Sequence, residues 1–237
     1  IVQFRHRFIN YDILVFTGLY PEHIESHGGF EKYKEAKGRL FAHLKRCKTK
    51  YADDKKIIHR GISGLKKTDL NRVKKTIIAN LDNEHANYFL NFWAEAKVVY
   101  TNSDIANLNE FKANLTNDIK MVGYNNIKAS QFGTSFKVDN AEINLKLLGA
   151  FNAANAMNAV CVCLSQGVKS NEIKDGLEKI EGVAGRLEKI DALTTLSTGE
   201  RQNFTVIVDY AFEPNAVAKL YETIKLTHLH QTTISFT

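Results

Sequence analysis

A lysine occupies one position of an otherwise apolar helical stripe. In the segment 29–47, large side chains recur three or four residues apart, at Phe30, Tyr33, Leu40, Phe41 and Leu44. Lys37 fills the remaining place in this progression, and on a helix of 3.6 residues per turn it shares their face. A half-buried ammonium is costly unless it is paired or chemically changed, and burial favours the neutral, nucleophilic amine. The spacing predicts a reactive lysine, although a lysine that extends along apolar neighbours to solvent gives the same pattern.

A histidine-bearing loop precedes this helix. The apolar run Asp12–Phe16 is typical of a strand, and the loop after it carries His23, fourteen residues before Lys37. A strand, a histidine loop and a lysine helix in this order indicate a site for a metal and a phosphate. His23 and His27 are also spaced for zinc binding on a helix, but no third ligand stands at useful spacing. A capping or surface role is expected for His27.

The elements that must position these side chains alternate between strands and helices. This alternation predicts an α/β fold with a mostly parallel sheet covered by helices on both faces. Strands are expected within 76–81, 97–101, 119–122 and 205–208, the last of them buried, and an amphipathic helix over Asn83–Trp93. A polar stretch is expected at Lys48–Lys56.

The second half of the sequence carries clear turn and cap signals. Alternation in Ser135–Leu148 predicts a small antiparallel hairpin. Glycines bracket a helix over Asn152–Gln166, and Ser170 is the expected cap of another over Asn171–Ile180. Pro214 fits the first turn of a further helix. The turn Glu181–Arg186 between these helices is the predicted domain boundary.

Composition limits the partners. The net charge is +6, and the basic residues lack a regular interleaving with aromatic ones, so we expect no nucleic-acid partner. Cys47, Cys161 and Cys163 form neither a zinc pattern nor a disulfide framework, which favours a reducing cytoplasm. No apolar run reaches the length of a membrane span, and no signal peptide opens the chain; we expect no membrane association.

Four ordered segments resemble one enzyme family. The run FTGLYPEHIESHGGFEKYKEAKGRLF (Phe16–Phe41) resembles the central domain of the ATP-dependent Mur ligases, and within them the MurE type, whose pattern reads roughly FTNLxxDHxDxHGxxExYxxAKxxLF. LLGAFNAANAMNAV (Leu147–Val160) is similar to the family's adenine-side GxxNxxNAxAA segment. VAGRLEKI (Val183–Ile190) and VIVDYAFEPNAV (Val206–Val217) are similar to its PGRxE turn and its DYAHxPxAL strand and loop.

The resemblance implies roles for individual residues. His23 matches a histidine that helps to hold Mg²⁺, and Lys37 matches a lysine that is carbamylated by carbon dioxide. A carbamate turns a buried cation into an anion with two oxygens, which suits Mg²⁺ with water between them. Asn152 and Asn155 match asparagines near the adenine of ATP. Among the remaining matched residues, Arg186 corresponds to a linker arginine near the phosphates and Asp209 to an aspartate of the nucleotide site.

The resemblance also implies an activity and a domain layout. The activity is an ATP-dependent addition of an amino acid to a UDP-linked muramoyl peptide in peptidoglycan synthesis, through an acyl phosphate, by a cytoplasmic monomer. Residues 1–184 correspond to most of the central domain and 185–237 to the start of the C-terminal domain. The chain begins with Ile1 and ends in an apolar-alternating run, and we interpret it as an internal fragment that is inactive alone.

Departures from the pattern leave alternatives open. Gly18 replaces the usual Asn, Glu22 an Asp and Phe212 a His, and no GxxGK[ST] phosphate loop occurs in the sequence. A non-catalytic, degenerate module of the same family is therefore one alternative. A related folate or poly-glutamate ligase is another. Asn80 and Asp82 resemble the family's NADD turn, and we expect them to be structural.

Overall fold

In the computed structural model of the chain, the described residues are 4–21, 27–52, 57–59, 71–103, 119–190 and 206–226. His23 and Glu22 lie outside them. The chain divides into two compact units. Unit 1 contains residues 1–124 and 157–168, and unit 2 contains residues 125–156 and 169–237. Within the described ranges, no helix has the length and apolar character needed to cross a membrane.

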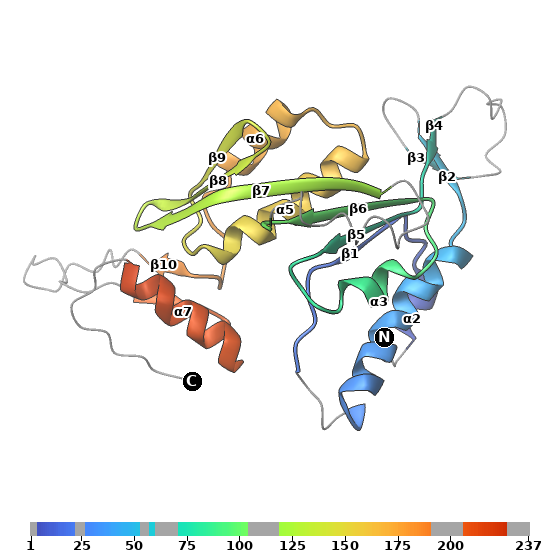
Figure 1. The fold of residues 1–237 in the computed structure, drawn as a ribbon, viewed down its shortest axis with the longest axis horizontal. Helices are drawn as coiled ribbons and strands as arrows, with labels where there is room; N and C mark the ends of the chain where they lie inside the picture. The colour runs from blue at the N-terminus through green and yellow to red at the C-terminus, as the bar shows by residue number, and fades with distance from the viewer. Residues whose placement is uncertain are drawn as a thin grey trace, which may run out of the picture. The chain divides into compact units, whose positions relative to one another are not determined.

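Unit 1 is built on parallel strands, as the sequence predicts (Figure 1). The strands run in the order β1 (Ile13–Phe16), β5 (Thr76–Asn80), β6 (Ala96–Thr101) and β7 (Ile119–Ser130), and each neighbouring pair is parallel. The sheet continues through β7 to β8 and β9 of unit 2. All five residues of β5 are buried, because this strand has a neighbour on each side and side chains packed on both faces.

Helices cover the two faces of this sheet, so the predicted layered α/β architecture is confirmed. On one face, α2 (Phe30–His43), the 3-10 helix η2 (Leu44–Arg46) and α3 (Ala86–Leu90) complete an apolar core with the strands. Its fully buried members include Leu44, Ile77, Ala79, Phe89 and Val99. On the other face, the buried Tyr100 of β6 bonds to Asn158 of α5 (Phe151–Ser165).

Part of the polar stretch Lys48–Lys56 belongs to a small sheet, which the sequence did not indicate. It contributes β2 (Lys50–Ala52), which lies between β3 (Ile57–His59) and β4 (Asn71–Val73) in a small antiparallel sheet. Polar residues form these strands because backbone pairing, and not burial, defines them: Lys50 and Tyr51 of β2 are only half-buried.

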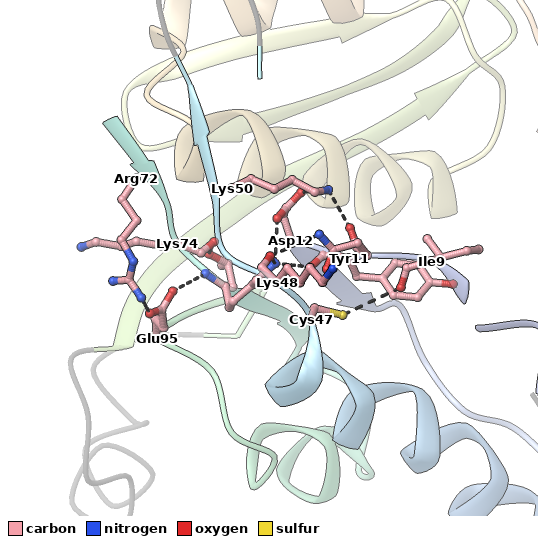
Figure 2. A network of polar contacts seen from close by, with 12 residues as sticks. Ile9, Tyr11, Asp12, Cys47, Lys48, Lys50, Arg72, Lys74 and Glu95 are labelled. Atoms are coloured by element: carbon pink, nitrogen blue, oxygen red, sulfur yellow. Dashed lines mark hydrogen bonds and ion pairs between the residues drawn. The ribbon is translucent and has the colours of Figure 1, made fainter. Parts of the chain in front are cut away.

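A polar network joins this small sheet to the residues that directly precede β1 (Figure 2). Lys75 is 3% exposed, and its Nζ donates to the carbonyl oxygens of Tyr11 and Lys48 and to Asp12 Oδ1 at 2.6, 2.8 and 2.9 Å. Lys50 Nζ donates to the other oxygen of Asp12 at 2.5 Å. One carboxylate therefore compensates two lysines that are largely removed from water, which is the condition for keeping such charges in a fold.

Unit 2 contains the predicted hairpin and two of the three predicted helices, whereas α5 is divided between the two units. Strands β8 (Gly133–Val138) and β9 (Ala141–Leu145) are antiparallel. Helix α6 (Ser170–Glu178) contacts β9, where Glu178 Oε1 accepts a hydrogen bond from Asn144 N at 2.9 Å. Helix α7 (Pro214–Leu226) begins at Pro214, as expected. Strands β10 (Glu188–Ile190) and β11 (Val206–Val208) form a separate antiparallel pair.

Three local expectations are corrected. The helix expected over Asn83–Trp93 is confined to α3, because Asn83 Oδ1 accepts from His85 N at 3.2 Å and holds a turn before it. Ser170 is the first residue of α6 and not its cap; Lys169 precedes the helix, and Lys169 N donates to Glu172 Oε2. Strand β11 is not buried, since β10 is its one partner among the described strands.

Candidate active site

Helix α2 presents Lys37 beside a buried tyrosine. Lys37 is half-buried, and its Nζ lies 4.9 Å from the centroid of the Tyr33 ring. Tyr33 is 6% exposed and also contacts the imidazole of His27. Among the described residues, no carboxylate forms an ion pair with Lys37. The amine thus lies against the apolar face that the spacing predicts, in contact with an aromatic ring.

The loop after β1 is held by Asn80, the last residue of β5, and by Asn83, which follows this strand. Asn80 Nδ2 donates to Thr17 O at 3.3 Å, and Asn83 Nδ2 donates to Leu19 O at 3.4 Å. Between these carbonyls, Gly18 has φ = 154°, a conformation that L side chains rarely adopt. The departure from the family pattern at Gly18 therefore has a conformational reason in this chain. This anchored loop leads into the segment that carries His23.

Asp82 is the main acceptor at the carboxyl ends of the parallel strands. Its carboxylate accepts hydrogen bonds from Thr101 Oγ1, from Asn102 N and from the hydroxyl of Tyr124. These donors come from the end of β6 and from β7, so one side chain after β5 joins three neighbouring strands. The geometry favours the structural role expected for Asp82, because both carboxylate oxygens are already occupied by protein donors.

A buried polar layer lies behind this edge of the sheet. Tyr100 is fully buried, and its hydroxyl donates to Asn158 Oδ1 at 2.8 Å. Burial raises the pKa of Tyr100 and of Tyr124, and in Tyr124 the neighbouring Asp82 carboxylate adds to the effect. Burial also raises the pKa of the Cys161 thiol to about 12. These groups therefore remain neutral at physiological pH and act as hydrogen-bonding or packing groups, not as bases or nucleophiles.

The two predicted adenine-side asparagines lie together at the start of α5. Asn152 Nδ2 donates to Leu148 O at 2.7 Å, and Asn155 Nδ2 donates to Asn152 Oδ1 at 3.0 Å. Asn155 is exposed and Asn152 half-buried. Three residues apart on a helix, they share one face, and the hydrogen bond between them fixes which oxygen and which amide group remain available to a ligand.

Arg186 and Asp209 also lie close together, because Leu187, the neighbour of Arg186, bonds to Asp209, which stands 22 positions further along the chain. Asp209 Oδ2 accepts from Leu187 N at 2.7 Å, and the Arg186 guanidinium lies 5.4 Å from the centroid of Tyr210. Phe212 packs edge-on against the same ring and is 65% exposed. Within unit 2 the structure thus brings an arginine, a carboxylate and two exposed aromatic rings to the end of β11.

The sequence indicates which residues stand at these positions, but it does not indicate the contacts that hold them. Tyr100 and Asn158 were not among the expected site residues, although Asn158 stands three residues after Asn155 and so shares its helical face. Among the described residues, no group of three or more His, Cys, Asp or Glu is placed to hold a metal ion.

Known proteins that are similar to this chain include Mur ligases. Residues 1–74 match the model of the Mur ligase middle domain. The UDP-N-acetylmuramoyl-L-alanyl-D-glutamate–2,6-diaminopimelate ligase of Halalkalibacterium halodurans is 29% identical over 224 residues, which cover 93% of this chain and 37% of that protein. The ligase of the same name from Bacillus cereus is 30% identical over 220 residues, 91% of this chain and 36% of that protein. The chain thus spans a little over a third of the length of these relatives.

Solved structures share the fold. A UDP-N-acetylmuramoyl-L-alanyl-D-glutamate–2,6-diaminopimelate ligase superposes with a TM-score of 0.59 at 22% identity, over 94% of this chain and 37% of that one. The D-alanyl-D-alanyl-adding Mur ligase of Acinetobacter baumannii gives a TM-score of 0.61 at 15% identity, over 93% of this chain and 39% of that one. The chain is therefore similar over most of its length to Mur ligases of the diaminopimelate-adding type.

Proposed function

We propose that the chain is part of an ATP-dependent ligase that adds an amino acid to a UDP-N-acetylmuramoyl peptide in peptidoglycan synthesis. The observation that carries the proposal is the similarity to the named ligases over more than nine tenths of the chain. The reaction joins a carboxylate to an amine: ATP phosphorylates the carboxylate, and the amine displaces phosphate from the acyl phosphate. Such a reaction depends on positioning and charge neutralisation, and it places the enzyme in the cytoplasm, where ATP is available.

In this proposal Lys37 is the residue that changes chemically. Its neutral amine attacks carbon dioxide, a nitrogen–carbon bond forms, and a proton is released. The resulting carbamate and His23 would hold Mg²⁺, which supplies charge neutralisation for the phosphate oxygens when bound. The position of the Lys37 amine against the ring of the buried Tyr33 supports this assignment, because an apolar setting favours the neutral amine.

The nucleotide residues of the proposal belong to unit 2. Asn152 and Asn155 would contact the adenine through the amide atoms left over from their mutual hydrogen bond. Arg186 would lie near the phosphates, since its side chain is exposed and its guanidinium lies over the face of Tyr210. The second oxygen of Asp209 would accept from a ribose hydroxyl, because the first already accepts from Leu187 N.

Replacement of Lys37 in the complete gene product tests the proposal. With the UDP-linked muramoyl dipeptide, ATP and 2,6-diaminopimelate, Lys37→Ala should abolish ligation, and added short carboxylates, which replace the carbamate oxygens, should restore part of it. Lys34→Ala is the matched control: Lys34 lies one turn earlier on α2, pairs with Glu31 at 2.7 Å and should be dispensable. Full activity of the Lys37→Ala protein would refute the role of the carbamate.

A second candidate function is a non-catalytic module of the same family. The exposed Phe212 favours it, because a phenyl ring stands where the family pattern has a histidine and can neither donate nor accept a hydrogen bond. The same assay separates the two. ATP-dependent ligation by the complete gene product with any amino acid excludes the non-catalytic module, whereas nucleotide binding without turnover supports it.

A further inference from the structure

The hydrogen bond between Tyr100 and Asn158 connects the parallel sheet to the helix that carries the proposed adenine-side asparagines. Tyr100 Oη donates to Asn158 Oδ1 at 2.8 Å, and Tyr100 is fully buried. Asn158 stands on α5, three residues beyond Asn155 and six beyond Asn152. Neighbouring members of this series, three residues apart, share a helix face, whereas Asn152 and Asn158 lie about 120° apart around the axis of the same helix.

Asn158 departs from the family pattern, although the positions around it match. In the pattern GxxNxxNAxAA, aligned on Gly149, Asn152 and Asn155, the position of Asn158 is an alanine. An amide in place of a methyl group is costly next to a sheet unless a partner satisfies it. Tyr100 is that partner. Where the alanine of the pattern would make an apolar contact, Asn158 makes a directional hydrogen bond to Tyr100.

A directional bond at this place fixes the rotation of α5 about its axis. Apolar packing tolerates small rotations, whereas a hydrogen bond weakens as its angle changes. Side chains project about 5–6 Å from a helix axis, so a rotation of about 20° moves their ends by about 2 Å. Because Asn158, Asn155 and Asn152 belong to one helix, a rotation at the first is a rotation at the other two.

We propose that the Tyr100–Asn158 pair is a positioning device for nucleotide recognition, which sets the direction of the amide groups of Asn152 and Asn155 toward the adenine of ATP. The inference rests on the proposed function of these two residues. Neither Tyr100 nor Asn158 contacts the nucleotide in this scheme. Tyr100 is fully buried, and the Asn158 carboxamide oxygen is bonded to it.

Two tyrosine substitutions in the complete gene product provide the test. Tyr100→Phe removes the hydroxyl that bonds to α5. Tyr124→Phe is a matched control: Tyr124 is 4% exposed and neighbours Tyr100, but its hydroxyl bonds to Asp82 in the loop after β5. Both changes remove one buried hydroxyl, so a general loss of stability should affect the two variants alike. Binding of ADP is measured by calorimetry, and the melting temperature is recorded for each protein.

Tyr100→Phe should raise the dissociation constant for ADP roughly three- to tenfold, the worth of one ordinary hydrogen bond, while Tyr124→Phe leaves it unchanged. In the ligation assay, Tyr100→Phe should raise KM for ATP and leave kcat and KM for the UDP-linked peptide near their original values. If Asn155 transmits the effect, the double variant Asn155→Ala with Tyr100→Phe should bind ADP no more weakly than Asn155→Ala alone. A further rise in the dissociation constant of the double variant would measure the contribution of Asn152.

The outcomes separate this inference from the function on which it rests. If the unaltered protein does not bind ADP, the proposed function fails. If Asn155→Ala weakens ADP binding but Tyr100→Phe does not, the function stands and the positioning role is refuted. Equal weakening by Tyr100→Phe and Tyr124→Phe also refutes it, because the effect would then follow the loss of a buried hydroxyl and not the anchoring of α5.

Discussion

At the scale of single residues, His6 is the clearest case of a titratable group constrained by burial. It belongs to the 3-10 helix η1 (Arg5–Phe8) and is 8% exposed. Its ring meets that of His43 edge to face at 5.4 Å, and within the described residues its buried Nδ1 has no hydrogen-bond partner. Burial, followed by the charge of His43, lowers the pKa of His6 below its ordinary value of 6.5.

This lowered pKa predicts a loss of stability in acid. The unfolded chain binds a proton at His6 more readily than the folded chain, so the contribution of His6 to stability is present above about pH 6.5 and declines as the pH falls below it. His6→Phe should flatten the pH dependence of the unfolding free energy between about pH 7 and 5 relative to the original chain. The measurement is urea unfolding at a series of pH values.

His85→Asn is the control for this experiment, since His85 lies beside the exposed carboxylate of Glu84 and apart from His6. It should leave the slope in that pH range closer to that of the original chain than His6→Phe does. An unchanged slope in His6→Phe would show that other groups determine the acid response.

The residue scale also shows where sequence reasoning succeeds. The stripe around Lys37 and the Asn152–Asn155 spacing depend on helical periodicity, which a sequence displays directly. The contacts of Asp82 with Thr101 and Tyr124 depend on which strands become neighbours. A sequence does not display that adjacency, so these hydrogen bonds could not be predicted from it.

At the scale of elements, α2 packs closely against the segment around α3 at Gly38. A Cβ atom at Gly38 would lie 2.5 Å from Tyr88 Oη and 2.9 Å from Phe92 Cζ. Gly38→Ala should therefore destabilise the chain by about 1–3 kcal/mol through overpacking, despite the better helix propensity of alanine. Chemical denaturation of the two proteins measures the difference.

Gly176→Ala is the matched control for the α2 substitution. Gly176 lies within α6, and no atom lies within 4 Å of the Cβ it would gain. This change should be neutral or stabilise the chain by up to about 1 kcal/mol. A stabilising Gly38→Ala would show that Tyr88 and Phe92 move aside without cost.

The network around Asp12 ties the small sheet of β2, β3 and β4 to β1 (Figure 2). Asp12→Ala would leave Lys75 and Lys50, which are 3% and 15% exposed in their side chains, without their shared carboxylate. We expect a loss of about 3–5 kcal/mol of unfolding free energy, as for other buried charges that lose a partner. Thermal and urea unfolding provide the measurement.

Arg72→Ala removes an ion pair of a different kind from the same region. The Arg72 side chain is 52% exposed and pairs with Glu95, so its loss should cost only about 0–1 kcal/mol. Equal effects of the Asp12 and Arg72 substitutions would contradict the view that burial, and not pairing as such, makes the Asp12 network important.

Elements defined by burial were easier to predict than elements defined by pairing alone. Strand β5 is recognisable because all its residues are buried, and the hairpin β8–β9 because its residues alternate. Strands β2 and β4 carry Lys50, Arg72 and other polar side chains, and their hydrogen bonds leave no periodic trace in the sequence. The length of α3 was overestimated because apolar residues continue beyond the point where the helix ends at Leu90.

At the scale of the whole molecule, the described elements differ widely in how they are held. Strand β5 is buried throughout and lies between β1 and β6. Strands β10 and β11 pair with each other, and Val206 and Val208 are 38% and 44% exposed. Local opening costs little free energy where few apolar contacts are lost, and approaches the global value in the core.

Hydrogen exchange followed by mass spectrometry should therefore rank the elements in a definite order. Amides of β5 and β6 should exchange only through global unfolding, and their protection should fall with added urea as global stability does. Amides of β10 and β11 should exchange through local opening at a rate that depends little on urea. Helix α5 provides an internal reference, because buried residues such as Met157 and Cys161 tie it to the core and predict protection near that of β6. Protection of β11 equal to that of β5 would mean that this strand pair folds as one cooperative unit with the sheet, against the exposure of its side chains.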